Sequence, residues 1–204
     1  MTSEKLTNDT ILSIVEKYAR KNSLEDDIHG FAHVKRVLTL SLKIGEHYNP
    51  KDLILKSAVL LHDIGRIDEK DISSHVNHAE LSAQKTLKFF KNNSFKLKEN
   101  IVSKIIHAIR AHSFSNNITP ISIEAKILSD ADKLDALGAI GLYRTIGFTI
   151  KNQGNLQDVM KHLNEKILHL KNQMYLEFSK RLAEERSHII TMFYNDIKKE
   201  YLST

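Results

Sequence analysis

The scarcity of helix-breaking residues is the feature that most limits what this chain can fold into. Only two prolines and seven glycines occur in 204 residues. Between them, apolar residues recur at helical spacing, as in Val34, Val37, Leu40 and Ile44. No segment gives a convincing strand pattern, and only residues 117–123 are ambiguous. The sequence therefore predicts an all-α fold.

Local signals place several helix starts and stops. The segment NPKD, residues 49–52, predicts an N-cap, a proline at the first helical position and an acid in the first turn. We expect this helix to run to about His62, with Gly65 as its C-terminal stop. The segment NHAE, residues 77–80, predicts a second capped helix, with Leu87 among the apolar positions that follow it.

The C-terminal part is predicted to hold a pair of long helices. The segment KNQGN, residues 151–155, is the best candidate for a loop between a core of about 25–150 and an arm of about 155–204. We treat 1–204 as one domain because two helices alone bury too little surface. Two apolar stripes support the helices: Leu163, Ile167, Leu170 and Met174, then Ile189, Phe193, Ile197 and Tyr201.

Composition restricts both location and chemistry. The longest purely apolar run is residues 58–61, and the N-terminus has no signal-peptide core, so we expect a cytoplasmic protein without membrane contact. Because the chain has no cysteine, any metal must be held by imidazole and carboxylate groups. The net charge of +5 comes from basic residues interleaved with acidic ones, which indicates a solvated surface more than a nucleic-acid interface.

Polar residues on apolar helix faces suggest a buried site. His62 and Asp63 end an apolar helix, His33 shares a face with Val37 and Leu40, and Asp132 lies on a largely apolar face. Each could be a hydrogen-bonded core residue, but a buried carboxylate needs a cation or strong donors. Together, two imidazoles and two carboxylates make a mixed site for Mn, Fe, Co, Ni or Zn, with Mg possible.

These motifs resemble those of the HD-domain superfamily of metal-dependent phosphohydrolases, in particular its small stand-alone members. The order is a histidine on an early helix, then LLHDIGR, then DADKLDALGAIG, and the resemblance covers roughly residues 28–188. It implies an HD-domain helical bundle that holds one divalent ion, or two, between helices. Carried over position by position, the metal ligands are His33, His62, Asp63 and Asp132.

The resemblance also suggests residues for catalysis and substrate binding. His78 and His112 stand where some relatives have ligands to a second metal, and we favour direct contact of both with the substrate; His112 is preferred to His107. Arg66 replaces a glutamate that assists catalysis in nucleoside monophosphate phosphatases of this superfamily. A guanidinium can hold phosphate oxygens, although Arg66 could instead pair with Asp68 or Glu69.

Further charged residues complete the set of candidates. Asp63, or a nearby acid such as Asp135, would orient the attacking water, while His78, His112 and Arg66 would stabilise the developing charge. Other basic groups could line the phosphate path: Lys133, Arg144, Lys180 and Arg181.

The function that these expectations favour is hydrolysis of a phosphate ester or anhydride in a small phosphorylated substrate. A nucleotide is preferred, with cleavage of nucleoside or deoxynucleoside triphosphates to monophosphate and pyrophosphate as the first hypothesis. Hydrolysis of guanosine tetraphosphate or cyclic nucleotides, a non-catalytic nucleotide or metal sensor, and a nucleic-acid-binding protein are the alternatives. The protein would act as a monomer or homodimer.

Overall fold

The computed structural model is helical throughout the part of the chain that it describes, which is residues 6–68, 77–93, 95–113 and 116–202. No strand occurs in these ranges, so the all-α prediction is confirmed. The chain forms two compact units, Met1–Ser129 and Asp130–Thr204. The boundary lies within one helix, α6, and not at residues 151–155; the single-domain organisation of 1–204 stays a prediction.

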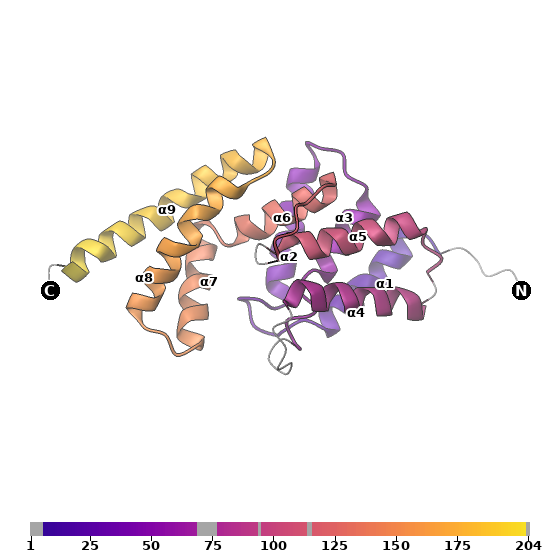
Figure 1. The fold of residues 1–204 in the computed structure, drawn as a ribbon, viewed down its shortest axis with the longest axis horizontal. Coiled ribbons are helices and arrows are strands. Elements are labelled where there is room, and N and C mark those ends of the chain that lie inside the picture. The colour runs from indigo at the N-terminus through magenta and orange to yellow at the C-terminus, as the bar shows by residue number, and fades with distance from the viewer. Residues whose placement is uncertain (1–5, 69–76, 94, 114–115, 203–204) are drawn as a thin grey trace, which may run out of the picture. The chain divides into compact units, whose positions relative to one another are not determined.

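The first unit is built around helix α3. Its helices are α1 (Asn8–Lys21), α2 (Phe31–Gly45), α3 (Asp52–Leu61), α4 (His78–Asn93), α5 (Glu99–His112) and the first part of α6 (Ile123–Asp135). Helix α3 packs against α1, α2, α4 and α5 (Figure 1). Residues 57–61 of α3 are all buried, which explains why all of them except Ser57 are apolar. His62 and Asp63, which directly follow α3, therefore lie in the interior of the unit.

The predicted start of α3 is wrong by two residues. Asn49 has a φ of 48°, in the left-handed region, and Pro50 precedes the helix. Lys51 is the N-cap, and its backbone N–H donates to the Glu124 carboxylate at 3.0 Å. The backbone N–H at the start of this helix therefore donates to an acid that is distant in sequence, whereas the local pattern placed the N-cap at Asn49.

Gly65 is needed for close packing and not only as a helix stop. Helix α3 ends at Leu61, and a turn carries the chain past Gly65 towards α4. A Cβ atom on Gly65 would lie 2.5 Å from the His78 carbonyl oxygen and 2.6 Å from the Ser82 nitrogen. The Gly65 N–H also donates to Ser82 Oγ at 2.9 Å. This contact fixes the start of α4 against the turn that carries Asp63.

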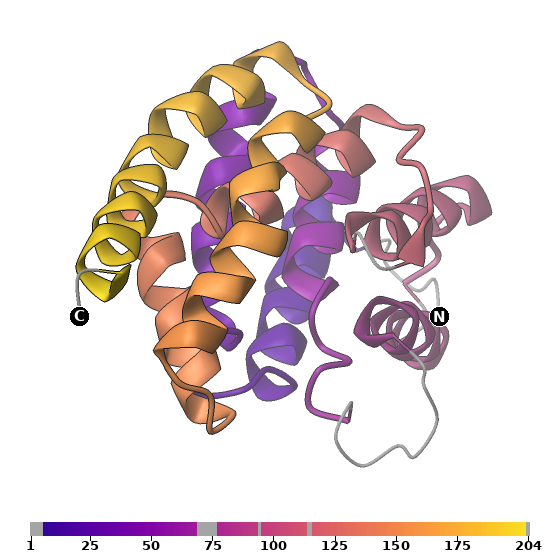
Figure 2. The same ribbon diagram turned by 60° about the vertical axis from the view of Figure 1, so that its left-hand side comes forward.

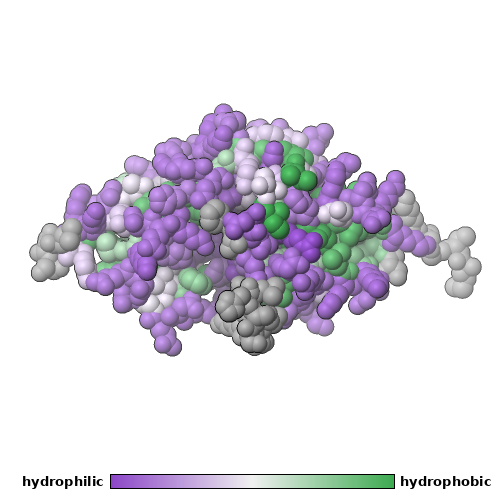
Figure 3. Space-filling view, viewed as in Figure 1, coloured by the Kyte–Doolittle hydropathy of each residue, from purple (hydrophilic) through white to green (hydrophobic). Residues whose placement is uncertain are grey.

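An apolar groove lies on the surface of α4 and the segment after it. Leu87, predicted on the apolar face of α4, is 42% exposed and lines this groove together with Phe90, Phe95 and Val102. Figure 3 shows apolar surface in the region that α4 and α5 occupy in Figure 1. Leu87 therefore belongs to a surface patch and not to the core. The buried residues of α4 include Ala83 and Phe90.

The second unit contains one long helix, not the predicted pair. Its elements are α7 (Gly138–Lys151), α8 (Leu156–Glu165), the 3₁₀ helix η2 (Ile167–Gln173) and α9 (Glu177–Leu202), and α8 and η2 both contact α9 (Figures 1 and 2). Ile167 and Leu170 are buried as predicted. They are three residues apart, so they share a face when the helix tightens to three residues per turn.

The buried face of α9 also differs from the predicted stripe. Ile189 and Tyr201 are exposed, whereas Ser179, Ala183 and Ile190 are buried. The small side chains of Ser179 and Ala183 let α9 approach its neighbours closely, and hydrophobicity alone did not reveal this face. The predicted loop at residues 151–155 is confirmed, since α7 ends at Lys151 and a capping box starts α8.

No helix in the described part of the chain has both the length and the apolar composition needed to cross a membrane.

Candidate metal centre

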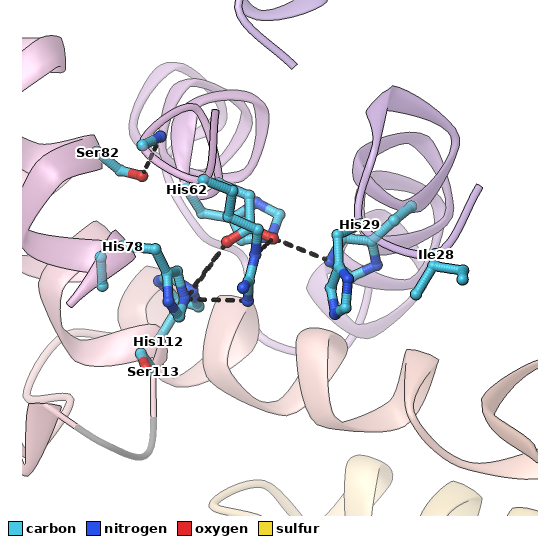
Figure 4. A network of polar contacts seen from close by, with 12 residues as sticks. Ile28, His29, His62, His78, Ser82, His112 and Ser113 are labelled. Carbon is cyan, nitrogen blue, oxygen red and sulfur yellow. Dashed lines mark hydrogen bonds and ion pairs between the residues drawn. The ribbon is translucent and has the colours of Figure 1, made fainter. Parts of the chain in front are cut away.

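Four histidines and one aspartate of the first unit converge on a buried cluster. Their exposed fractions are low: His33 1%, His62 0%, Asp63 3%, His78 8% and His112 2%. His33 comes from α2, His62 and Asp63 from the end of α3, His78 from the first residue of α4 and His112 from the last residue of α5. Figure 4 shows His62, His78 and His112 directed towards a common point. The predicted inward orientation of His33, His62 and Asp63 is confirmed.

Backbone carbonyls set the tautomers of two of these imidazoles. His62 Nδ1 lies 2.7 Å from the Val59 carbonyl oxygen, and His112 Nδ1 lies 2.6 Å from that of Ile109. Because a carbonyl oxygen can only accept, each Nδ1 carries the proton and donates it. Each Nε2 therefore directs a lone pair into the cluster, as a metal ligand must.

The first set of donor atoms is His33 Nε2, His62 Nε2 and Asp63 Oδ2. The two nitrogens are 3.3 Å apart, and they lie 3.6 and 3.7 Å from the oxygen. An ion at the centre of such a triangle would be about 2.0 Å from each atom, which matches ordinary metal–imidazole and metal–carboxylate bonds. The residues present therefore fit a divalent metal.

The second set of donor atoms uses the other oxygen of the same carboxylate. Asp63 Oδ1 lies 3.5 Å from His78 Nε2 and 3.6 Å from His112 Nε2, and these nitrogens are 3.4 Å apart. Oδ1 is buried and accepts no hydrogen bond within the described part of the chain. Such an atom is costly unless a cation offsets it. His62, Asp63 and His112 also form a group that could hold an ion.

Arg66 already places a positive charge in this cluster. Its Nε donates to Asp63 Oδ2 at 2.5 Å, and its NH2 group lies 3.1 Å from His78 Nε2. The alternative pairing with Asp68 is wrong, since Asp68 pairs with Lys85 at 2.8 Å; Glu69 lies outside the described residues. Arg66 is thus part of the candidate site, as predicted from its position after the HD pair.

The electrostatics of the cluster favour an ionised aspartate. Burial alone would raise the pKa of Asp63, but the guanidinium of Arg66 and the imidazoles of His62, His112 and His78 hold that pKa well below its usual range. A fully buried carboxylate that remains negative attracts cations strongly. This is the electrostatic property that a divalent ion requires.

The remaining predicted site residues belong to the second unit. Asp132 is partly buried on α6. Asp135 and Arg144 are buried and pair with each other at 2.8 Å. Burial lowers the pKa of Lys133, whose amine lies 5.0 Å from the centre of the Tyr175 ring. Their predicted roles stay predictions.

Two other residues near these motifs have structural partners. His107 Nε2 accepts a hydrogen bond from the Ile121 backbone N–H at 3.1 Å, which accounts for it without any role in the cluster. His29, which the sequence interpretation did not single out, lies edge-on to His33 with ring centres 6.4 Å apart (Figure 4). The sequence signal that could have identified His29 is its position four residues before His33, just before α2 begins.

Comparison with known proteins gives one consistent family. Residues 30–137 match the model of the HD domain. The chain is 33% identical over 184 residues to the protein YpgQ of Bacillus subtilis, covering 86% of each.

Solved structures extend this similarity to the fold. The crystal structure of Bacillus subtilis YpgQ in complex with ADP has a TM-score of 0.74 and 26% identity, covering 96% of this chain and 97% of the other. A "predicted HD superfamily hydrolase" from an uncultured Thermotogales bacterium has a TM-score of 0.64 and 25% identity, covering 94% of this chain and 91% of the other. The region that matches the HD-domain model, residues 30–137, includes His33, His62, Asp63, His78, His112 and Asp132.

Proposed function

The chain belongs to the HD domain family, and we propose that it is a divalent-metal-dependent phosphohydrolase that cleaves a phosphate ester or anhydride. The observation that carries this proposal is the buried Asp63 carboxylate, which remains ionised between imidazole Nε2 atoms spaced for a metal ion. A hydrogen-bonded structural cluster would not leave Asp63 Oδ1 without a donor.

The proposed ligands are His33, His62, Asp63 and Asp132. The first three are supported by their spacing, and Asp132 by its place in the family's order of motifs. Mixed nitrogen and oxygen ligands suit Mn, Fe, Co, Ni or Zn better than Mg, and we take manganese as the first metal to test. When bound, such an ion supplies acidity to water and polarises a phosphoryl oxygen.

The chain's own residues would then position the reactants. Asp63 is the acceptor that orients the attacking water, because its pKa keeps it ionised. Arg66 lies beside it and brings a permanent charge for phosphoryl oxygens. His112 Nε2 can accept a proton from the substrate, and His78 contacts the substrate beside Arg66, whose guanidinium it holds. Asp135 and Arg144 pair with each other at 2.8 Å, and we keep their predicted roles, an acid that orients the water and a basic group that contacts phosphate, as part of the proposal.

A nucleotide is the proposed substrate class. The homologous YpgQ binds ADP in its crystal structure, and the net charge of +5 favours an anionic substrate. Within this class we propose nucleoside or deoxynucleoside triphosphates, cleaved to monophosphate and pyrophosphate. We further propose that the protein acts in the cytoplasm as a monomer or homodimer.

A product assay across a nucleotide panel tests this proposal. Nucleoside triphosphates, diphosphates, cyclic nucleotides and guanosine tetraphosphate would each be incubated with Mn²⁺, and phosphate and pyrophosphate would be measured separately. Pyrophosphate without free phosphate from triphosphates is the expected result. Release of free phosphate from triphosphates would show that a different bond is cut. Turnover of only another nucleotide of the panel would show that triphosphates are not the substrate. Nucleotide binding without turnover in metal-loaded protein would contradict the enzyme and support a sensor.

A further inference from the structure

Asp63 serves two sets of imidazoles with its two oxygens. Oδ2 faces His33 and His62, and Oδ1 faces His78 and His112, at 3.5 to 3.7 Å in every case. A carboxylate that reaches two such sets could bridge two ions, as carboxylates do in centres whose metals are about 3.5–4 Å apart. The distances alone would therefore allow a two-metal centre.

Arg66 already occupies part of the second set. Its NH2 group donates to His78 Nε2 at 3.1 Å, which uses the lone pair that a metal at this position would need. Its Nε donates to Asp63 Oδ2 at 2.5 Å, so the guanidinium spans the aspartate and the histidine. A guanidinium stays protonated throughout the physiological pH range. The cluster thus contains a fixed monovalent cation beside the shared carboxylate.

We propose that Arg66 takes the place of a second metal ion, so that the centre holds one divalent ion and one guanidinium. This inference rests on the proposed function. A second ion would have to displace the Arg66 guanidinium from His78 Nε2 and leave this permanent charge, which also donates to Asp63 Oδ2, close to two divalent ions.

The consequence concerns how the substrate is held. A metal ion accepts oxygen atoms in several directions, whereas the planar guanidinium offers paired N–H donors that match two oxygens of one phosphate. Arg66 is 22% exposed at its side chain, while Asp63 is 2% exposed. Arg66 is therefore the more accessible of the two to a phosphate group of the substrate. It acts as a specificity-determining residue for a phosphate group next to the one attacked.

Metal stoichiometry in Arg66→Gln tests this role without using activity. Purified full-length proteins would be loaded with excess Mn²⁺ and desalted; elemental analysis gives the bound Mn²⁺ and low-temperature electron paramagnetic resonance its coupling. We expect one uncoupled ion in the wild type and two exchange-coupled ions in Arg66→Gln, since His78 Nε2 no longer accepts from Arg66 and can bind an ion together with Asp63 Oδ1. The double variant Arg66→Gln/His78→Ala should return to one ion.

Arg110→Gln is the matched control. Arg110 also pairs with a carboxylate, donating to Glu80 at 2.6 and 2.8 Å, but it lies outside the cluster. This variant should keep one ion.

The outcomes separate this inference from the proposed function. Two ions in the wild type, or one ion in folded Arg66→Gln, would overturn the role of Arg66 while leaving a metal-dependent hydrolase intact. No bound ion in any of the proteins would overturn both. If Arg66→Gln does not fold, the wild-type stoichiometry still decides, because two coupled ions there are incompatible with the proposal.

Discussion

Two buried aspartates of this protein have opposite electrostatic environments. Asp63 lies among Arg66 and several imidazoles, which keep its pKa low despite burial. Asp130 is buried too, but its pKa is raised because burial outweighs the backbone N–H groups of Tyr175 and Leu176. Asp63 is thus suited to bind cations, whereas Asp130 holds the chain just before α9 in place. Their sequence contexts, each next to apolar residues, did not distinguish these roles.

Replacing Asp130 should destabilise the second unit. Its two oxygens accept separately from the N–H groups of Tyr175 and Leu176, each at 2.9 Å. Asparagine has one oxygen, so Asp130→Asn leaves one buried N–H without its acceptor, at a cost of about 1–3 kcal/mol. Urea unfolding would measure this loss. Asp196→Asn, on the exposed part of α9, is the control and should change the unfolding free energy by less than about 0.5 kcal/mol.

His107 gives stability a dependence on pH. Burial lowers its pKa below the ordinary value, and only the neutral ring can accept the Ile121 N–H. The unfolded chain binds the proton more readily, so this contribution is complete above about pH 6.5 and is lost as the pH falls through the folded-state pKa.

Thermal unfolding at two pH values tests this contribution. Between about pH 7.5 and about pH 5, the wild type should lose more stability than His107→Asn, which keeps an acceptor but does not titrate. His188→Asn, at an exposed position of α9, should behave as the wild type does. Equal losses in wild type and His107→Asn would show that His107 contributes nothing to the pH dependence.

At the scale of elements, the contact between Gly65 and α4 aligns two parts of the candidate centre. Any side chain at Gly65 would press on the backbone of His78 and Ser82. Gly65→Ala should therefore destabilise the protein by about 1–3 kcal/mol, as overpacking does, and weaken Mn²⁺ binding by shifting the turn that carries Asp63. Unfolding and metal titration would measure both effects.

Gly45→Ala is the control for this substitution. A Cβ atom there would lie 3.2 Å from Pro50 Cγ, a side-chain atom that can shift by a few tenths of an ångström. Its effect on stability should be smaller, and it should leave Mn²⁺ binding unchanged. If Gly65→Ala has no larger effect than Gly45→Ala, the turn and α4 are not held together as we describe.

The helices of the first unit were predictable because hydrophobic periodicity determines which face is buried. The inward position of His33 followed from Val37 and Leu40, which share its buried face. The second unit was less predictable. Its 3₁₀ segment keeps the same apolar residues buried at a different pitch, and α9 buries serine and alanine. Neither property changes the hydrophobic pattern enough to be recognised in the sequence.

For the candidate centre, the sequence indicated residue types and orientation but not mutual contacts. The two imidazole sets of Asp63, and the position of Arg66 across them, depend on how α2, α3, α4 and α5 pack. The tautomers of His62 and His112 depend on carbonyls one turn earlier in their own helices. Spacing along the chain contains none of these distances.

For the whole molecule, a bound metal ion should raise the stability of the folded chain, and we propose Asp132 as one of its ligands. We expect Mn²⁺ at about 100 times its dissociation constant to stabilise the chain by about 2.7 kcal/mol, since an ion that binds only the folded state adds its binding energy. Calorimetric unfolding with and without Mn²⁺ would measure this. Asp132→Ala should reduce the shift. An unchanged shift would remove Asp132 from the ligand set.

The central claim is that a metal held at Asp63 supports hydrolysis of a phosphate bond. The most direct measurement is the rate of deoxynucleoside triphosphate hydrolysis with Mn²⁺ and with a chelator, in the wild type, Asp63→Asn and the control Asp68→Asn. We predict turnover that requires Mn²⁺ in the wild type and Asp68→Asn, and a loss of at least about 1,000-fold in Asp63→Asn. Turnover that survives both the chelator and Asp63→Asn would contradict the claim.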